Sequence, residues 1–238
     1  MKTLADGADT AAQGFVTQAN TAAAAALSDA STAPDVDTAT MDSSNAQDIA
    51  ADAFEAVNAV NPMPPYTPGS QAAQLIDAAM ASAQAAQTAA SACAGFANDA
   101  DMDRQTVIAR ANDAHAAAVI VDMKVNDAIS ILNGGGFFFD FGLIFRFLDD
   151  LSTAFAEKAV AVQAKADAQT SLGNAQSNLT KAGGQLGLAQ VAQTQTENDI
   201  AQAAAAAQAA ATNGGSGTGD DHDGDDNSHK RPGGGHQG

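Results

Sequence analysis

The sequence has no tryptophan, one tyrosine and a single cysteine in 238 residues. With one cysteine no intramolecular disulfide can form, and Cys93, which lies in an alanine-rich stretch, is predicted to be a small buried thiol. Basic residues are also scarce, with 10 Lys and Arg against 28 Asp and Glu. Because nucleic-acid binding and attraction to anionic membranes both need clustered cations, this balance argues against both and predicts no nucleic-acid partner.

Long apolar runs are missing as well. No stretch reaches the roughly 18 consecutive apolar residues of an ordinary transmembrane helix. Residues 1–14 lack the apolar core of a cleavable signal peptide, so we expect either a cytoplasmic protein or export by a route without such a signal. The localisation itself stays open between these two.

Large apolar side chains are few, because Leu, Ile, Val and Phe together make up 40 of the 238 residues. Combined with a net charge of −18, this composition is typical of chains that do not bury a globular core. The 60 alanines favour order instead, because alanine has the highest helix propensity. The sequence therefore predicts an all-α protein of elongated, closely spaced helices.

Four zones follow one another along the chain, and they differ in composition. They are residues 1–61, with two short candidate helices at 10–28 and 45–60; residues 62–69, a proline-rich joint; residues 70–212, a long helical hairpin that begins at an N-cap on Ser70; and residues 213–238, a Gly- and Asp-rich tail predicted to be disordered.

Both arms of the hairpin carry the seven-residue pattern of a coiled coil. The first arm, residues 71–132, is expected to be interrupted between Gly95 and Asp103. In the second arm, residues 149–212, alanine recurs every seven residues with leucine three positions earlier, and three glycines at 183, 184 and 187 are expected to weaken it. The predicted helix seam consists of Leu172, Ala175, Leu179, Ala182, Leu186 and Ala189.

Six of the ten phenylalanines lie between the arms, in NGGGFFFDFGLIFRFLDDL, residues 133–151. The odd positions from 137 to 147 are all apolar, so a short β segment at 137–148 fits at least as well as a helix. Burying one Phe side chain stabilises a protein by roughly 1.5–3 kcal/mol, so this much aromatic surface needs cover. The predicted interface or membrane-contact residues are Phe137, Phe138, Phe139, Phe141, Leu143, Phe145 and Phe147.

Two interpretations of this aromatic tip remain open. It is either a local hydrophobic core, covered by the N-terminal helices or by another copy of the chain, or a membrane-seeking tip comparable in layout to the apolar tongue of helical-hairpin toxins. The charged residues of the tip are expected to be solvated in both cases. They are Asp140, Arg146, Asp149 and Asp150.

No catalytic, cofactor or metal constellation emerges from the residue pattern. Asp99, Asp101 and Asp103 imitate the first half of a calcium loop, but arginines occupy the positions where the loop needs its glycine and its bidentate glutamate. The triple glycine at 134–136 lacks the spacing and the basic residue of a phosphate loop. We therefore expect no cofactor and no enzymatic activity.

Residues 53–94 contain a Val-x-x-Asn segment at Val57, a proline-containing turn, and then an Ala- and Gln-rich helix. This order resembles the subunits of R-bodies, which are bacterial proteinaceous ribbons. The resemblance implies a non-enzymatic subunit that polymerises. This sequence departs from the family in lacking its compact Gly-x-Ala-Pro-Ala turn and in adding a long C-terminal arm.

The sequence thus favours a non-enzymatic structural protein that self-assembles, as a homo-oligomer or with related helical subunits, through its alanine seams and aromatic tip. The alternative is a secreted or injected membrane-active protein that inserts residues 137–148 into a bilayer. Both hypotheses depend on the same aromatic surface, and they differ in what covers it.

Overall fold

The structure is a computed structural model, and it describes residues 2–60, 69–134 and 140–214. Within these ranges the protein is all-α and contains no β-strand, which confirms the predicted fold class. The chain forms four helices there, namely α1 (Lys2–Ser31), α2 (Asp37–Val60), α3 (Gln71–Asn133) and α4 (Phe141–Gly214).

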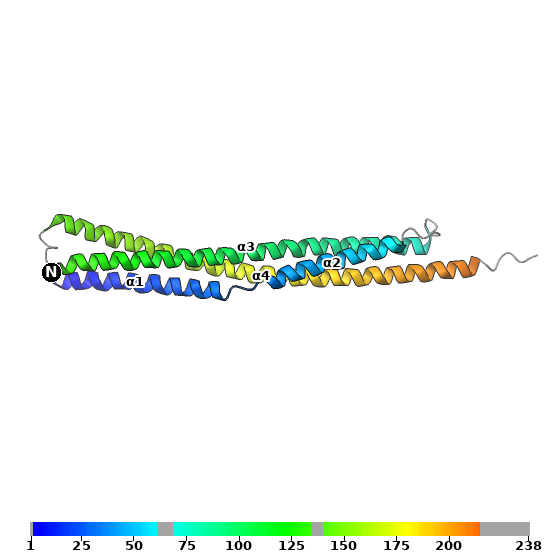
Figure 1. Cartoon of the computed structure of the whole chain (residues 1–238), viewed down its shortest axis with the longest axis horizontal. Coiled ribbons are helices and arrows are strands. Elements are labelled where there is room, and N and C mark those ends of the chain that lie inside the picture. The colour runs from blue at the N-terminus through cyan, green and yellow to red at the C-terminus, as the bar shows by residue number, and fades with distance from the viewer. Residues whose placement is uncertain (1, 61–68, 135–139, 215–238) are drawn as a thin grey trace, which may run out of the picture.

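The helices build one long rod (Figure 1). α3 and α4 lie side by side and antiparallel along most of its length. α1 packs against one half of this pair and α2 packs against the other half, and both run antiparallel to α3. In the described residues α1 and α2 do not contact each other, so together they form the third, interrupted row of a three-helix rod.

α3 is continuous over 63 residues, so the predicted interruption between Gly95 and Asp103 was wrong. The heptad register explains why, because buried positions alternate in steps of four and three through this segment and beyond it. Arg104, which is half-buried, occupies the one position of the series that is not apolar. The buried positions are Ala72, Ile76, Ala79, Ala83, Ala86, Ala90, Cys93, Ala97, Ala100, Val107, Ala111, Ala114, Ala118, Val121, Val125 and Ala128.

α4 runs through its glycines without a break. One glycine in a helix costs about 1 kcal/mol relative to alanine. Packing of the buried face of α4, before and after the glycines in sequence, offsets this cost. The central column of that face recurs every seven residues and is buried throughout. Its members are Phe147, Ala154, Ala161, Ala168, Ala175, Ala182, Ala189, Thr196 and Ala203.

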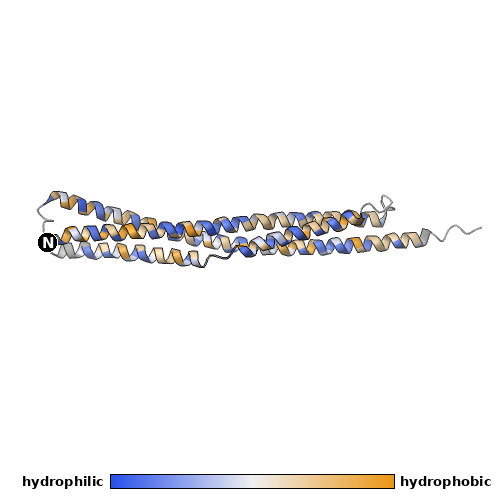
Figure 2. Ribbon diagram, in the orientation of Figure 1, coloured by the Kyte–Doolittle hydropathy of each residue, from blue (hydrophilic) through white to orange (hydrophobic). Residues whose placement is uncertain are grey.

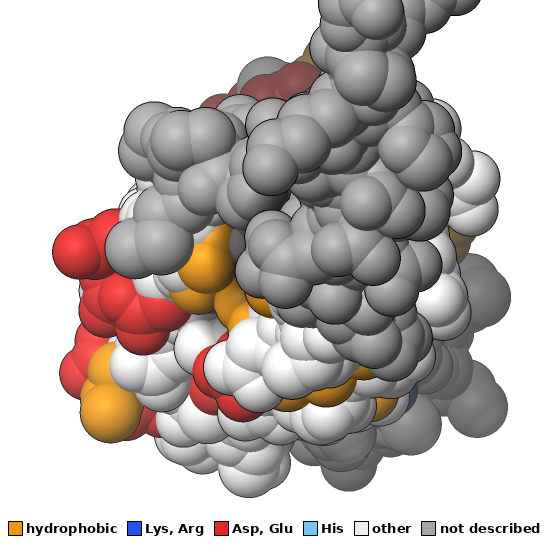
Figure 3. Space-filling view, turned by 90° about the vertical axis from the view of Figure 1, so that its right-hand side faces the viewer, with side chains coloured by type: hydrophobic (Ala, Val, Ile, Leu, Met, Phe, Trp, Pro, Cys, Tyr) orange, Lys and Arg blue, Asp and Glu red, His pale blue; other side chains and the backbone are white. Residues whose placement is uncertain are grey.

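The core has two parts, and alanine dominates both. One part joins α1 to the C-terminal half of α3 and the N-terminal half of α4, and the other joins α2 to the remaining halves. Figure 2 shows the resulting pattern, in which hydrophobic and hydrophilic residues alternate along every helix. Viewed end-on from the end at which α3 begins, acidic side chains gather along one edge of the rod (Figure 3).

Side-chain caps fix where the helices begin. The Ser70 hydroxyl accepts a hydrogen bond of 3.2 Å from the backbone N–H of Ala73, which confirms the predicted N-cap of α3. The residue before it, Gly69, has a φ of 83°, a conformation that glycine adopts without strain. Asp35 accepts from the backbone N–H of Asp37 at the start of α2.

The proline-rich joint and the acidic tail fall largely outside the described residues. The structure describes only Gly69 of the predicted joint at residues 62–69. Of the tail predicted at residues 213–238, only Asn213 and Gly214 are described, as the last residues of α4.

Candidate interface at the aromatic end

The aromatic segment begins α4. Asp140 precedes the helix, and its carboxylate accepts a hydrogen bond of 2.8 Å from the backbone N–H of Gly142. Its carbonyl accepts the first helical bond, from the N–H of Ile144. Residues 141–148 are therefore helical, and the expectation of a β segment at 137–148 was wrong for them. The alternation of apolar residues suggested a strand, but the cap at Asp140 starts a helix here.

The helix separates the phenylalanines onto different faces. Phe147 is buried with 7% of its surface exposed, whereas Phe141 and Phe145 are 78% and 69% exposed. Leu143 is half-buried. The N-terminal helices therefore do not cover Phe141 and Phe145. Phe137, Phe138 and Phe139 lie outside the described residues.

Asp150 forms an ion pair inside the rod instead of being solvated as expected. Its residue surface is only 3% exposed, and Lys124 of α3 donates a hydrogen bond of 2.9 Å to its Oδ1. This hydrogen bond, together with the charge of Asp150, raises the pKa of Lys124. Asp150 Oδ2 is buried without a protein partner. The other charged residues of the tip, Asp140, Arg146 and Asp149, are exposed as expected.

An aromatic contact between α1 and α4 lies further along the rod from this end. The rings of Phe15 and Phe155 meet edge to face with their centroids 5.6 Å apart. The Nζ of Lys158 lies 4.7 Å from the centroid of Phe155 and 5.3 Å from that of Phe15. The sequence reasoning missed Phe155 as a site residue. The signal was present, because Phe155 follows Phe141 and Leu148 at intervals of seven residues.

The predicted seam residues occupy two neighbouring columns of α4. Ala175, Ala182 and Ala189 have no exposed surface. The leucines of the second column are half-buried and pack against the two core parts; they are Leu172, Leu179 and Leu186. The close approach at the alanine column allows the thiol of Cys93 to donate to the carbonyl of Ala182 at 3.3 Å.

Cys93 is buried, as predicted. Burial raises the pKa of its thiol, and the nearby carboxylate of Asp42 raises it further. The thiol is therefore held in its neutral form at neutral pH, which suits a small packing residue on an alanine seam.

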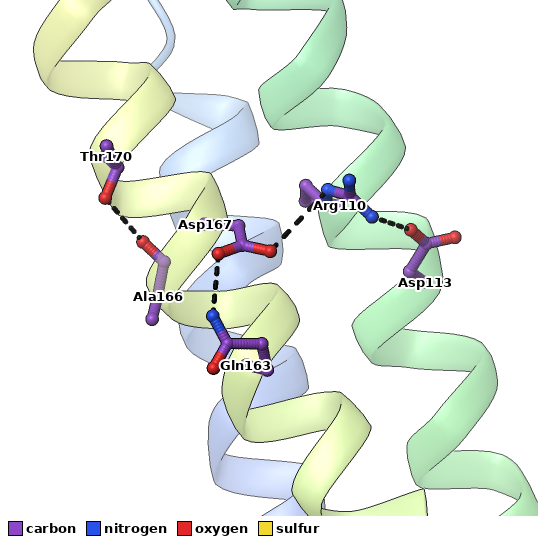
Figure 4. Close-up of polar contacts among 6 residues, drawn as sticks. All are labelled: Arg110, Asp113, Gln163, Ala166, Asp167 and Thr170. Atoms are coloured by element: carbon purple, nitrogen blue, oxygen red, sulfur yellow. Dashed lines mark hydrogen bonds and ion pairs between the residues drawn. The ribbon is translucent and has the colours of Figure 1, made fainter.

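An open groove of about 560 Å³ follows α3 and α4 on the side away from α1. Arg110 of α3 reaches across it to Asp167 of α4 at 3.8 Å, and it also contacts Asp113 of its own helix at 3.1 Å (Figure 4). Gln163 donates to the same Asp167, and Thr170 donates to the carbonyl of Ala166. The other three contacts lie within one helix each, so the exposed contact between Arg110 and Asp167 alone links α3 to α4 across this groove.

Metal ligands do not cluster among the described residues. No group of three or more His, Cys, Asp or Glu side chains there is placed to hold a metal ion. None of the four helices has an apolar stretch long enough to cross a membrane.

Comparison with known proteins adds no further identification. No family model, no curated protein and no solved structure matches this chain.

Proposed function

We propose that the protein is a non-enzymatic structural rod that self-assembles through its aromatic end. The observation that carries this proposal is the combination of two apolar surfaces on α4. One surface is the buried alanine column, along which α4 packs against α3 within the chain. The other is exposed and includes Phe141 and Phe145, so cover for it must come from another molecule.

The groups with shifted pKa values support a structural role. Burial and the charge of Asp42 raise the pKa of Cys93, and the hydrogen bond and charge of Asp150 raise that of Lys124. Both side chains also bond across a helix pair. Catalytic sites use such shifts in a cleft where several groups converge on a substrate. Here each shifted group already has its partner within the packing.

Assembly into an extended polymer fits the shape of the molecule. Each rod is about 110 Å long, taking the 74 residues of α4 at about 1.5 Å each. Rods that associate at their ends form elongated assemblies while burying little surface at each interface. The resemblance of residues 53–94 to R-body subunits points in the same direction, since those subunits polymerise into ribbons.

Mass by light scattering together with electron microscopy tests the proposal. We expect the wild-type chain to form oligomers or filaments whose mass rises with concentration. Replacing Phe139, Phe141 and Phe145 with serine should lower this mass, because Phe141 and Phe145 are exposed aromatic surface. A wild-type chain that stays monomeric at millimolar concentration contradicts the proposed function.

The exposure of Phe141 and Phe145 also favours a second candidate, a membrane-active protein that covers these side chains with lipid. The same triple variant separates the two. If the tip binds membranes, the wild-type chain should be a monomer that co-floats with liposomes in a density gradient. The variant should fold equally well but no longer co-float. Self-assembly predicts a change of mass in the absence of lipid.

A further inference from the structure

The exposed phenylalanines belong to a longer stripe on the outer face of α4. Its apolar members are Phe141, Phe145, Leu148, Phe155 and Val162, with exposed fractions of 78%, 69%, 54%, 56% and 44%. Ser152 and Ala159, both exposed, occupy the two positions between them, so the stripe follows alternating steps of four and three. This spacing matches that of the buried core, and it is the spacing by which one helix packs along another.

The stripe is large enough for a specific interface. A whole Phe side chain contributes about 200 Å², so the three phenylalanines leave about 400 Å² exposed in one copy. Two copies facing each other bury about 800 Å² from these residues alone. Leu148, Val162 and the intervening residues bring the total close to the roughly 1,200 Å² at which specific interfaces begin.

We propose that a second copy of this chain covers the stripe, with the two α4 helices packed antiparallel around a two-fold axis near Ser152. This proposal rests on the self-assembly proposed above and specifies one contact of it, which by itself closes as a dimer. In this arrangement Phe141 of one copy lies opposite Val162 of the partner subunit, and Leu148 lies opposite Phe155 of the partner subunit. A two-fold interface of this kind needs only one surface, which pairs with itself.

Other segments of the same chain are poor occupants of the stripe. Residues 215–238 contain Pro232 as their one apolar side chain, and α4, which they follow in sequence, ends at the opposite end of the rod. Residues 135–139 join two fixed helix ends and reach about 10 Å at most. That reach stops well short of Phe155 and Val162, which lie about 20 Å and 30 Å along α4 from Phe141.

A bilayer fits the stripe less well than a helix does. In the seven-residue register of α4 the stripe forms two columns about 50° apart, whereas an apolar face that lies on a larger apolar surface spans about 100° or more. Charged residues flank it closely, with Asp149 on one side and Lys158 on the other. A narrow apolar seam with charged edges is the form that a helix partner needs.

The extent of the stripe selects the antiparallel arrangement. Beyond Val162 the same two columns continue as Ala166, Gln169, Gly173 and Gln176, so apolar contact is available only at the aromatic end. Each chain carries a net charge of −18, and parallel rods would hold these charges side by side along their whole length. Antiparallel rods overlap over about 32 Å and extend in opposite directions.

The test compares two variants of α4 that each lose exposed apolar side chains, one on the stripe and one away from it. The stripe variant carries Phe141→Ser, Phe145→Ser and Leu148→Ser. The control variant carries Leu188→Ser and Val191→Ser, which remove exposed apolar side chains from another part of α4. Because Phe155 also contacts Phe15, it is left in place, and Val162→Asp serves as an independent second probe of the stripe.

Light scattering and small-angle X-ray scattering on the full chain give the readout. We expect a wild-type dimer about 190 Å long, and a dissociation constant raised more than about tenfold in the stripe variant and in Val162→Asp, with the control variant unchanged. A dimer that survives both stripe changes overturns this interface and leaves self-assembly standing. A dimer only about 110 Å long overturns the antiparallel arrangement. A wild-type chain that never associates, or that binds neutral liposomes as a monomer, overturns both proposals.

Discussion

At the scale of single residues, the ion pair between Lys124 and Asp150 sets the axial position of α4 against α3. The surrounding core is mostly alanine, and an alanine column looks the same after a shift of seven residues. A buried polar pair does not, because a shifted helix would leave the carboxylate of Asp150 without its cation. The contact of 3.1 Å between Asn178 and Asp103 acts in the same way near the middle of the rod.

Removing one partner of this pair should destabilise the protein more than removing both. Lys124→Met leaves a buried carboxylate unpaired, whereas Lys124→Met combined with Asp150→Leu replaces the pair with apolar contacts. Urea denaturation should therefore give a lower midpoint for the single variant than for the double variant. Equal midpoints of the two variants would contradict the expected cost of an unpaired buried carboxylate.

The stability from this pair should also depend on pH. The folded state raises the pKa of Lys124, so the contribution is complete below the unfolded pKa of about 10.4 and is lost as pH rises through the higher folded value. Cys93 has a raised pKa too and acts with the same sign. Urea midpoints between pH 8 and pH 11, measured in a Cys93→Ala background, should fall more steeply with Lys124 present than in the double variant described above.

At the scale of the helices, glycine lowers the stability of α4 without interrupting it. A Cβ added at Gly173 or Gly184 would meet no atom within 4 Å, and both positions are exposed. Gly173→Ala and Gly184→Ala should each stabilise the fold by roughly 0.5–1 kcal/mol, because alanine has the higher helix propensity. Thermal unfolding measures this shift.

Gly69→Ala is the matched control for these changes. The space around Gly69 is equally open, but its φ is 83°, a conformation that alanine adopts only with strain. This substitution should lower the melting temperature. If all three substitutions had the same sign, helix propensity would not explain the result.

The sequence predicted the helical class, the N-cap at Ser70 and the burial of Cys93, because each depends on local chemistry or on a long periodic pattern. The β segment failed because a few alternating apolar residues fit two periods, and the cap at Asp140 decides between them. The predicted break between Gly95 and Asp103 was wrong because the seven-residue register of α3 continues through this segment, whatever its local composition. The burial of Asp150 depends on a partner 26 residues away, which no local pattern shows.

At the scale of the whole molecule, charge opposes association. Each chain carries a net charge of −18, so two rods repel each other at low ionic strength. The screening length falls from about 30 Å at 0.01 M salt to about 10 Å at 0.1 M. Light scattering should therefore show tighter association at 0.1 M than at 0.01 M sodium chloride. Weaker association at the higher salt concentration would indicate an interface held by opposite charges instead of by the apolar stripe.

The gap between α1 and α2 also affects how the rod responds to force. Thr32–Val36 interrupts one helical row at mid-length, and α1 and α2 do not touch across it. In the described residues only the helices α3 and α4 run past this point, so we expect lower bending stiffness there than in either half. An assembly of such rods should then curve by bending at each midpoint, with the core of each half left intact.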